Sequence, residues 1–323
     1  MLRIAGLLAA AVVCALAVAC AGSDDGSAGG VSGPTSSSSP TAVPETVCTP
    51  SLPHEPAVTH DAIDVGGLTR TYTLRVPPAY DGAARTPLVF AFHGLAQTAQ
   101  GLGDYTRIGA ATDSAGYIAV IPAGTGAIQH WNMRRTPGDA DDVAFVDALL
   151  TKVSADLCVD ADRVYAAGYS NGGGMAQALA CALPKRIAAV AVVASSWVPC
   201  RANVPLIAFH GIDDRIVPYA GGQTPPELGS IVFPPVRRSI SGWAGESGCD
   251  TLATIARLST EVELSNFGNC SGASEVLLYT ILGGGHTWPG ATPLDFLGYT
   301  TEQIDASQRM LEFFSTHTAA EAR

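Results

Sequence analysis

One stretch of this chain has the residue pattern of a nucleophile. Gly168-Tyr-Ser-Asn-Gly172 follows a short run of β-branched and aromatic residues and precedes a run of small residues. In that context G-x-S-x-G predicts a sharp turn from a strand into a helix, with the Ser170 hydroxyl pushed out at its tip. The glycines allow the turn where a Cβ would collide with the strand or the helix. The free N–H groups of the helix N-terminus would stabilise negative charge developing nearby, so the pattern suits attack on a carbonyl carbon.

Such a pentapeptide also arises by chance in a chain with 35 glycines, so the pattern needs an acid and a base. A serine hydroxyl becomes a good nucleophile when a neutral imidazole takes its proton and a carboxylate holds that imidazole in the right tautomer. His286 lies in a glycine-rich loop after the last predicted strand. Asp213 and Asp214 follow an earlier buried strand, and either could instead cap the turn after it. The order is therefore serine, acid, histidine.

Two other histidines, His93 and His210, also stand at predicted strand ends. Each directly precedes a glycine at a strand-to-loop turn. We expect these two side chains to hydrogen-bond locally and to shape their loops rather than to act as the base.

The elements that would position these residues alternate between strand and helix after an initial hairpin around Gly66-Gly67. The predicted strands cover Ala57–Val65, Leu68–Val76, Thr86–Phe92, Tyr117–Ile121, Arg163–Ala167, Ile187–Val193, Val204–Phe209 and Glu275–Leu282, with edge-hairpin sequence at Thr251–Leu264. The predicted helices run through Tyr105, Ile108, Ala111 and Ala115, from Asp141-Asp142 to Val153, and over Gly173–Leu183, Arg237–Glu246 and Thr301–Phe314. This pattern predicts an α/β fold with a mostly parallel, doubly wound sheet and an antiparallel N-terminal edge.

The N-terminus has the features of an export signal. Arg3 precedes an apolar segment, residues 4–19, that is short for a membrane span, and Leu16-Ala-Val-Ala-Cys20 resembles a bacterial lipobox. We therefore expect a signal peptide at 1–19, lipidation of Cys20, a disordered Ser/Gly/Pro-rich linker at 20–47 and one catalytic domain at 48–323. The protein would be held at the extracytoplasmic face of the membrane, or released. Ordinary secretory cleavage near Ala19 or Ala21 is the alternative.

The cysteines of the predicted domain agree with export. Six are present there, and an even number in an exported chain indicates disulfides, which for six allow 15 pairings. Local spacing favours Cys181–Cys200 and Cys249–Cys270, which leaves Cys48–Cys158. Zinc is the competing interpretation, but no C-x-x-C or clustered histidine accompanies the cysteines. Asp139, Asp141 and Asp142 lack the spacing of a complete calcium loop and suit helix capping better. We expect no metal.

The charge of the chain excludes some partners. Its formal net charge is −11 and its Lys and Arg residues are scattered, which does not suit binding to nucleic acid or to an anionic membrane surface. We expect a monomer that contacts the membrane only through its lipid anchor.

Several motifs together resemble the esterase family that groups polyhydroxybutyrate depolymerase-like lipoproteins with feruloyl and acetyl-xylan esterases. The matching residues span about Leu68 to Pro289: His93-Gly94 with Gln97, Trp131, Asp142-Val143-x-Phe145, Val159-Asp160-x-x-Arg163-Val164-Tyr165, Gly168-Tyr-Ser-Asn-Gly-Gly-Gly-Met175, His210-Gly211-x-x-Asp214-x-x-Val217-Pro218-Tyr219 and Gly283-Gly-Gly-His-x-Trp-Pro289. The serine–acid–histidine order is also that of α/β-hydrolases.

The resemblance implies an α/β-hydrolase fold with Ser170 as nucleophile, His286 as base and, by the family register, Asp214 rather than Asp213 as acid. The backbone N–H groups of Leu95 and Asn171 would form the oxyanion hole. Many relatives carry a cysteine at the position of Leu95, but only its backbone N–H is expected to matter.

The implied activity is hydrolysis of carboxylic esters through an acyl-enzyme, without a cofactor. Trp131 and Trp288 are candidates for lining the substrate cleft, although buried tryptophans are often core residues. Suitable substrates are polyhydroxyalkanoate oligomers, feruloylated or acetylated polysaccharides, and small acyl esters. The alternatives are a serine peptidase on the same fold and a non-catalytic ligand-binding lipoprotein.

Overall fold

The computed structural model describes residues 47–49, 51–195, 200, 203–224, 226 and 230–319. The predicted signal peptide, the lipidation site Cys20 and nearly all of the predicted linker lie outside these residues. No helix in the described ranges is long and apolar enough to cross a membrane.

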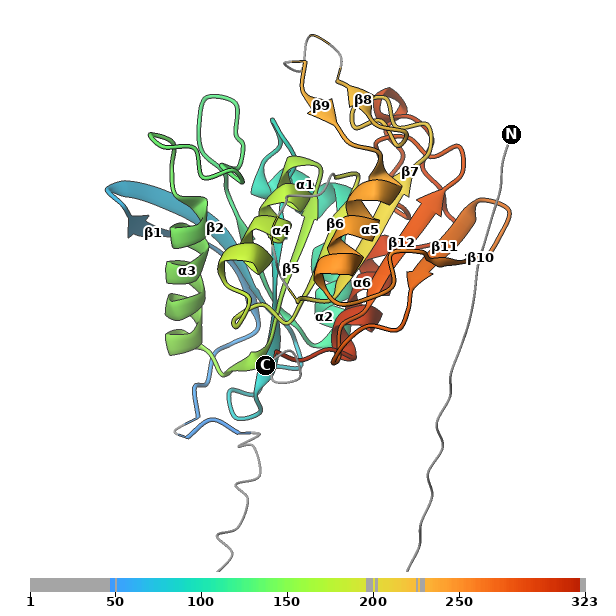
Figure 1. Ribbon diagram of the computed structural model, residues 1–323. Coiled ribbons are helices and arrows are strands. Elements are labelled where there is room, and N and C mark those ends of the chain that lie inside the picture. Colours follow the sequence, from blue (N-terminus) through green and yellow to red (C-terminus); the bar gives the residue numbers. More distant parts are fainter. Residues whose placement is uncertain are drawn as a thin grey trace, which may run out of the picture. The chain divides into compact units, whose positions relative to one another are not determined.

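A sheet of ten strands forms the centre of the protein, in the order β1-β2-β4-β3-β5-β6-β7-β12-β11-β10 (Figure 1). The six strands from β4 to β12 pair in parallel. The pairs β1–β2, β2–β4, β12–β11 and β11–β10 are antiparallel. The sheet is therefore antiparallel at both edges, and the hairpin sequence predicted near residue 260 forms the second edge.

Most elements begin and end close to the predicted bounds, but β5 is longer than the predicted strand Arg163–Ala167 at both ends. The strands are β1 Ala57–Val65, β2 Leu68–Val76, β3 Thr86–Phe92, β4 Ile118–Pro122, β5 Val159–Tyr169, β6 Ala189–Val193, β7 Leu206–Gly211, β10 Thr254–Arg257, β11 Val262–Phe267 and β12 Val276–Ile281. A separate two-stranded ribbon contains β8 Gly222–Gln223 and β9 Val232–Phe233. The helices are α1 Ala99–Thr106, α2 Ile108–Ala115, α3 Asp142–Asp156, α4 Asn171–Ala182, α5 Val236–Glu246, α6 Ala306–Ser315 and the 3₁₀ helix η2 Asp295–Leu297.

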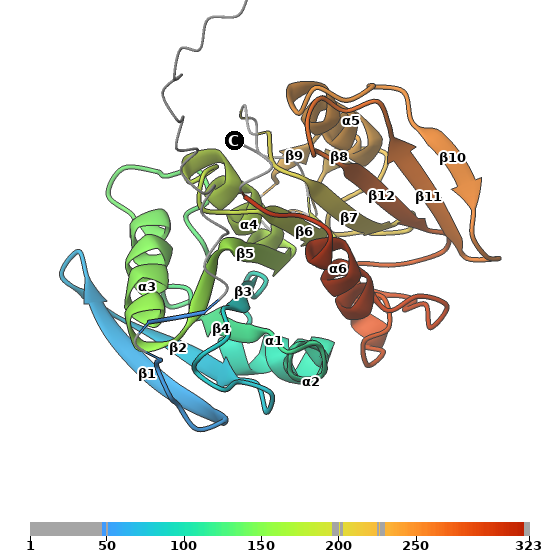
Figure 2. The same cartoon turned by 90° about the horizontal axis from the view of Figure 1, so that it is seen from below.

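The helices cover both faces of the sheet, which creates two apolar cores (Figure 2). Helices α3, α4 and α5 pack on one face, and α1, α2 and α6 pack on the other. The central strands β3, β4, β6 and β12 are buried along their whole length, because helices cover both of their faces. This arrangement explains why their sequences are continuous apolar runs and do not alternate.

Two predicted helices differ from the structure. The pattern from Tyr105 to Ala115 predicts one helix, but Arg107 adopts a left-handed conformation with φ of 53° and separates α1 from α2. The last helix begins at Ala306 rather than at Thr301. Asp305 caps this start, because its side chain accepts from the Gln308 N–H. Asp141 likewise caps α3 by accepting from the Ala144 N–H, as the capping interpretation expected.

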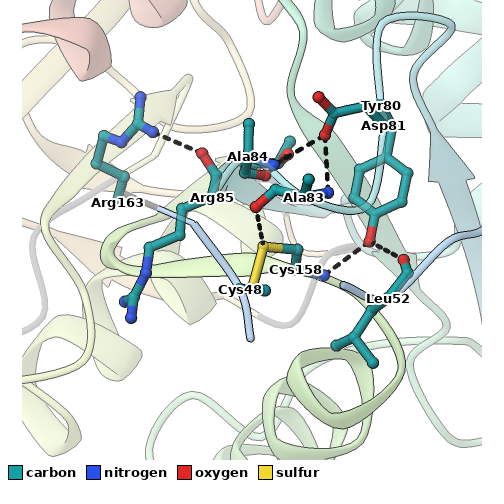
Figure 3. The surroundings of a disulfide bond; sticks show 10 residues. Cys48, Leu52, Tyr80, Asp81, Ala83, Ala84, Arg85, Cys158 and Arg163 are labelled. Atoms are coloured by element: carbon teal, nitrogen blue, oxygen red, sulfur yellow. Dashed lines mark hydrogen bonds between the residues drawn. A yellow bond between two sulfur atoms is a disulfide. The ribbon is translucent and has the colours of Figure 1, made fainter. Parts of the chain in front are cut away.

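All three predicted disulfides, Cys48–Cys158, Cys181–Cys200 and Cys249–Cys270, are confirmed. The first joins the segment before β1 to the start of β5 (Figure 3). Beside it, the Tyr80 hydroxyl accepts from the Cys158 N–H at 2.7 Å and donates to the Leu52 carbonyl at 2.7 Å. The disulfide thus closes a loop of 110 residues at the end of β5 opposite the serine.

Candidate active site

The predicted nucleophile stands between β5 and α4 on a sharply turned backbone. Ser170 has φ of 53° and ψ of −119°, a conformation that costs a non-glycine residue about 1–3 kcal/mol. A Cβ on Gly168 would lie 2.1 Å from the Gly172 carbonyl oxygen, and one on Gly172 would lie 2.1 Å from the Phe92 carbonyl oxygen. Only glycine fits at these two positions, because a side chain on Gly168 would collide within the β5–α4 turn and one on Gly172 would collide with the end of β3.

The acid and base come from the loops after two neighbouring strands. Asp214 follows β7 and His286 follows β12. The two strands pair in parallel, so both loops emerge at the carboxyl ends of the strands. His286 Nδ1 donates to Asp214 Oδ2 at 2.7 Å, and both residues are 4% exposed. Asp213 is exposed, which agrees with the family register that favours Asp214. Because Nδ1 is engaged, Nε2 is the nitrogen of His286 that remains available to accept a proton.

The Asp214 carboxylate is surrounded by donors. Its Oδ1 accepts from the N–H groups of Ile216 and Val217, each at 2.8 Å. Burial alone would raise the pKa of this carboxyl, but hydrogen bonds from His210 and His286 outweigh burial and hold the pKa below its usual value. Asp214 is therefore a carboxylate at neutral pH, as its predicted role beside a catalytic histidine requires.

His210 is closer to the chemistry than the sequence predicts. Its Nε2 lies 2.8 Å from the Val217 carbonyl oxygen, which is the local bond expected for this residue, but also 3.2 Å from Asp214 Oδ2. Both neighbours are acceptors, so Nε2 carries the proton. His210 therefore contacts the carboxylate of the predicted acid directly. The only signal in the sequence is its place at the strand end that also delivers Asp214.

Tyr169 also contacts the base and was not predicted as a site residue. Its hydroxyl donates to the His286 carbonyl at 2.5 Å, and the two rings lie 5.1 Å apart between centroids. Burial raises the pKa of Tyr169, so the phenol stays protonated and remains a donor. The residue before the nucleophile thus ties the β5–α4 turn to the loop that carries the base.

The loop after β3 leaves one amide free at the predicted oxyanion position. The Gly94 N–H donates to Gln97 Oε1, the Ala96 N–H to the Gln129 carbonyl and the Gln97 N–H to the Gly94 carbonyl. Among the described residues, no acceptor takes the Leu95 N–H.

Within the part of the chain that the structure describes, the Asn171 backbone N–H is the second amide without an acceptor. Asn171 is the first residue of α4, so its N–H has no acceptor within the helix. Gly172 brings this helix start against the carbonyl groups of Phe92 and His93, so the turn with Asn171 and the loop with Leu95 touch each other. Two free donors on touching segments beside Ser170 suit an oxyanion hole.

His93 holds that loop, as expected from its place before a glycine. Its Nδ1 donates to the Gly94 carbonyl at 2.8 Å, and its Nε2 accepts from the Gly124 N–H at 2.9 Å. Burial lowers the pKa of His93, so the ring stays neutral and keeps this tautomer.

Neither predicted substrate-lining tryptophan is exposed. Trp131 is 2% and Trp288 is 1% exposed. The Trp131 indole packs edge-on against Phe92, and the Trp288 indole donates to Ser307 Oγ on α6. Both side chains are buried, so their positions do not support the cleft-lining hypothesis.

A hollow of about 290 Å³ adjoins the base. His286 and Arg215 line it together with Phe296 and Tyr299, which are 81% and 51% exposed. A larger groove of about 600 Å³ lies between α2 and α6, but none of the predicted site residues lines it. Of the predicted catalytic and oxyanion residues, only His286 lines the smaller hollow.

The chain is similar to known esterases. Residues 70–211 match the family model described as esterase PHB depolymerase. Feruloyl esterase B of Piromyces equi is 31% identical over 231 residues, covering 67% of this chain and 42% of that protein. Feruloyl esterase C of Emericella nidulans is 33% identical over 183 residues, covering 54% of this chain and 65% of that protein. These matches support membership of the polyhydroxybutyrate depolymerase-like and feruloyl esterase family.

The chain spans less than two thirds of the length of these two family members. Among solved structures, an acetyl xylan esterase from Aspergillus awamori superposes with a TM-score of 0.58 at 14% identity, over 80% of this chain and 99% of that one. At this identity the superposition establishes the α/β-hydrolase fold and no more.

Proposed function

We propose that this family member is a serine esterase that hydrolyses carboxylic esters through an acyl-enzyme. The observation that carries the proposal is the 2.7 Å bond between His286 and Asp214 at the sheet edge where Ser170 stands. A buried, ionised acid that holds Nδ1 of a histidine has the geometry of a base prepared to accept a proton at Nε2.

In the first half of the reaction, Ser170 Oγ attacks the ester carbonyl carbon while its proton passes to His286 Nε2. The carbonyl oxygen becomes an oxyanion that accepts from the amides of Leu95 and Asn171. The intermediate then collapses, the bond to the alcohol oxygen breaks, and His286 returns its proton to that oxygen. The acyl group remains bonded to Ser170.

In the second half, water attacks the acyl-enzyme and gives a proton to His286. The second intermediate expels Ser170 Oγ, which takes the proton back, and the carboxylic acid leaves. Every bond made and broken is accounted for by these residues and water, so the proposed steps need no cofactor.

For the substrate we propose oligomeric or polysaccharide-bound esters, including feruloyl, acetyl and hydroxyalkanoate esters. The exposed rings of Phe296 and Tyr299 line the same hollow as His286, which favours esters that carry an aromatic or apolar group. A comparison of kcat/KM for methyl ferulate, acetylated xylan, hydroxybutyrate oligomers and a peptide anilide tests this assignment. If the peptide anilide has the highest kcat/KM, the protein is a peptidase and the esterase proposal is wrong.

The nucleophile is tested with Ser170→Ala. Hydrolysis of a p-nitrophenyl ester and labelling by a fluorophosphonate should both be lost, a fall of about 10⁶-fold in kcat if Ser170 is the nucleophile. Ser114→Ala is a matched control, since it removes an exposed helical hydroxyl outside the site. Equal hydrolysis by Ser170→Ala and wild type would refute the mechanism, and a folded wild type that neither hydrolyses esters nor takes the label would favour a non-catalytic binding protein.

We also propose that this catalytic domain, residues 48–323, acts outside the cytoplasm. Three disulfides support this location, because disulfides persist in oxidising compartments. The lipid anchor at Cys20 remains a proposal, which membrane fractionation of Cys20→Ala would test.

A further inference from the structure

Trp131 connects the two segments that carry the free oxyanion amides. It lies in the loop between β4 and α3, and its indole Nε1 donates to the His93 carbonyl at 2.8 Å. Its backbone N–H donates to the Asn171 side-chain Oδ1 at 2.7 Å. His93 lies two residues before Leu95, and Asn171 itself supplies the second amide. One buried residue thus holds both halves of the predicted oxyanion hole.

The connector is itself anchored in the core. The next residue, Asn132, donates its backbone N–H to Asp142 Oδ2 at 2.6 Å. Asp142 is buried at the start of α3 and pairs with buried Arg70 at 2.6 Å. Trp131 is therefore placed by a buried ion pair on one side and holds the β3 loop and the β5–α4 turn on the other.

We propose that Trp131 is a positioning residue that fixes the spacing and direction of the Leu95 and Asn171 amides. This inference rests on the proposed esterase function. Oxyanion-hole donors act because they are already aimed at the position where charge develops, so a small displacement of either donor weakens binding of the transition state. The ester ground state places little charge on that oxygen. Losing the connection should therefore lower kcat with little change in KM.

The indole N–H can be tested apart from the packing of the ring. In Trp131→Phe an aromatic ring still packs against Phe92, but the donor to the His93 carbonyl is lost. Trp243 is the matched control, because its buried indole also donates to a backbone carbonyl, that of Val204, at 3.0 Å, and it belongs to α5. Both variants, Trp131→Phe and Trp243→Phe, remove one indole–carbonyl hydrogen bond, but only the first is connected to the site.

The first measurement is kcat and KM for a p-nitrophenyl ester, with active enzyme counted by complete fluorophosphonate labelling. We expect kcat per active site to fall by about 10–100-fold in Trp131→Phe, less than the loss of a whole donor, with KM within about 3-fold. Trp243→Phe should keep kcat per active site within about 2-fold. Both substitutions remove packing in the core. A loss of stability from this cause would lower the amount of active enzyme and would leave kcat per active site unchanged.

The second measurement is inhibition by a trifluoromethyl ketone. Ser170 Oγ adds to its carbonyl carbon, the hydroxyl proton passes to His286, and the ketone oxygen becomes an oxyanion in the site. The inhibition constant should rise in Trp131→Phe by the same factor as kcat/KM falls, because both depend on the same two amides.

Asn171→Ala provides a second variant in case Trp131→Phe folds poorly. It cuts the other connection, from the Trp131 N–H to Asn171 Oδ1, and keeps the backbone amide of residue 171. The same pattern, lower kcat and weaker ketone binding at unchanged KM, is expected. If either variant, folded and labelled to completion, keeps wild-type kcat and ketone affinity, the positioning role is wrong. A wild type without esterase activity would instead overturn the proposed function.

Discussion

Replacing the proposed acid by its amide tests the site most directly, because the surroundings of Asp214 dictate how an asparagine must sit. Oδ1 of Asp214 accepts from two backbone N–H groups, those of Ile216 and Val217. In Asp214→Asn the amide oxygen has to stay there, since an NH₂ group cannot accept a hydrogen bond. The NH₂ group then occupies the Oδ2 position and faces Nδ1 of His286.

The consequence is a histidine in the wrong tautomer. An NH₂ donor opposite Nδ1 requires Nδ1 to be the acceptor, so the imidazole proton moves to Nε2, where the proton of Ser170 should go. We expect kcat to fall by about 10⁴-fold, which corresponds to roughly 5.5 kcal/mol of transition-state stabilisation. The NH₂ group also faces Nε2 of His210, so this second buried histidine loses one of its two acceptors and keeps only the Val217 carbonyl. The free energy of unfolding should therefore fall by about 1–3 kcal/mol.

The assay is kcat with a p-nitrophenyl ester per labelled active site, together with urea unfolding. Asp213→Asn is the matched control, because it makes the same change at the exposed neighbouring residue. We expect that variant to retain kcat within about 2-fold and stability within about 0.5 kcal/mol. If Asp213→Asn loses activity and Asp214→Asn keeps it, the tautomer reasoning and the choice of acid are both wrong.

Two further predictions concern stability. Replacing Cys48 and Cys158 together by serine should lower the free energy of unfolding by about 4.8 kcal/mol, and replacing Cys249 and Cys270 should lower it by about 3.3 kcal/mol. The loop-entropy relation gives the larger loss for the first pair because it closes a loop of 110 residues rather than 21. Equal losses in urea unfolding would contradict the loop-length argument. The second prediction follows from the lowered pKa of the Asp214 carboxyl: a carboxyl whose pKa is lower folded than unfolded stabilises the fold above its unfolded pKa of about 3.9 and loses this contribution as pH falls toward the folded value. We therefore expect the difference in the free energy of unfolding between wild type and Asp214→Asn to become smaller as the pH falls below about 4. Urea unfolding at pH 7 and at decreasing pH measures this difference. A difference that grew with acid would contradict the lowered pKa of Asp214.

Local patterns predicted the elements that depend on neighbouring residues. The β1–β2 hairpin and β3 begin and end where their apolar alternation and flanking turns indicate. The nucleophile turn was predictable for the same reason, because Gly168, Ser170 and Gly172 lie within five residues. The break between α1 and α2 was missed, since the side-chain pattern continues through Arg107 while its backbone turns left-handed.

The contacts of the site side chains depend on the order of strands in the sheet, which no local pattern contains. Asp214 and His286 are 72 residues apart and meet because β7 pairs with β12. The same pairing, with β11 and β10 beyond it, produced the second antiparallel edge. His210 likewise contacts the acid only because the chain turns back on itself after β7.

By itself, the sequence determined which residues are proposed to carry the chemistry, because a nucleophile turn, a strand-end acid and a glycine-loop histidine each have a local pattern. It also determined the disulfide pairing, through even cysteine number and short spacings. Only the tertiary structure decided which side chains support that chemistry. Trp131 changed from a candidate for contact with substrate to a buried connector, since burial and hydrogen-bond partners arise from packing between segments distant in the chain.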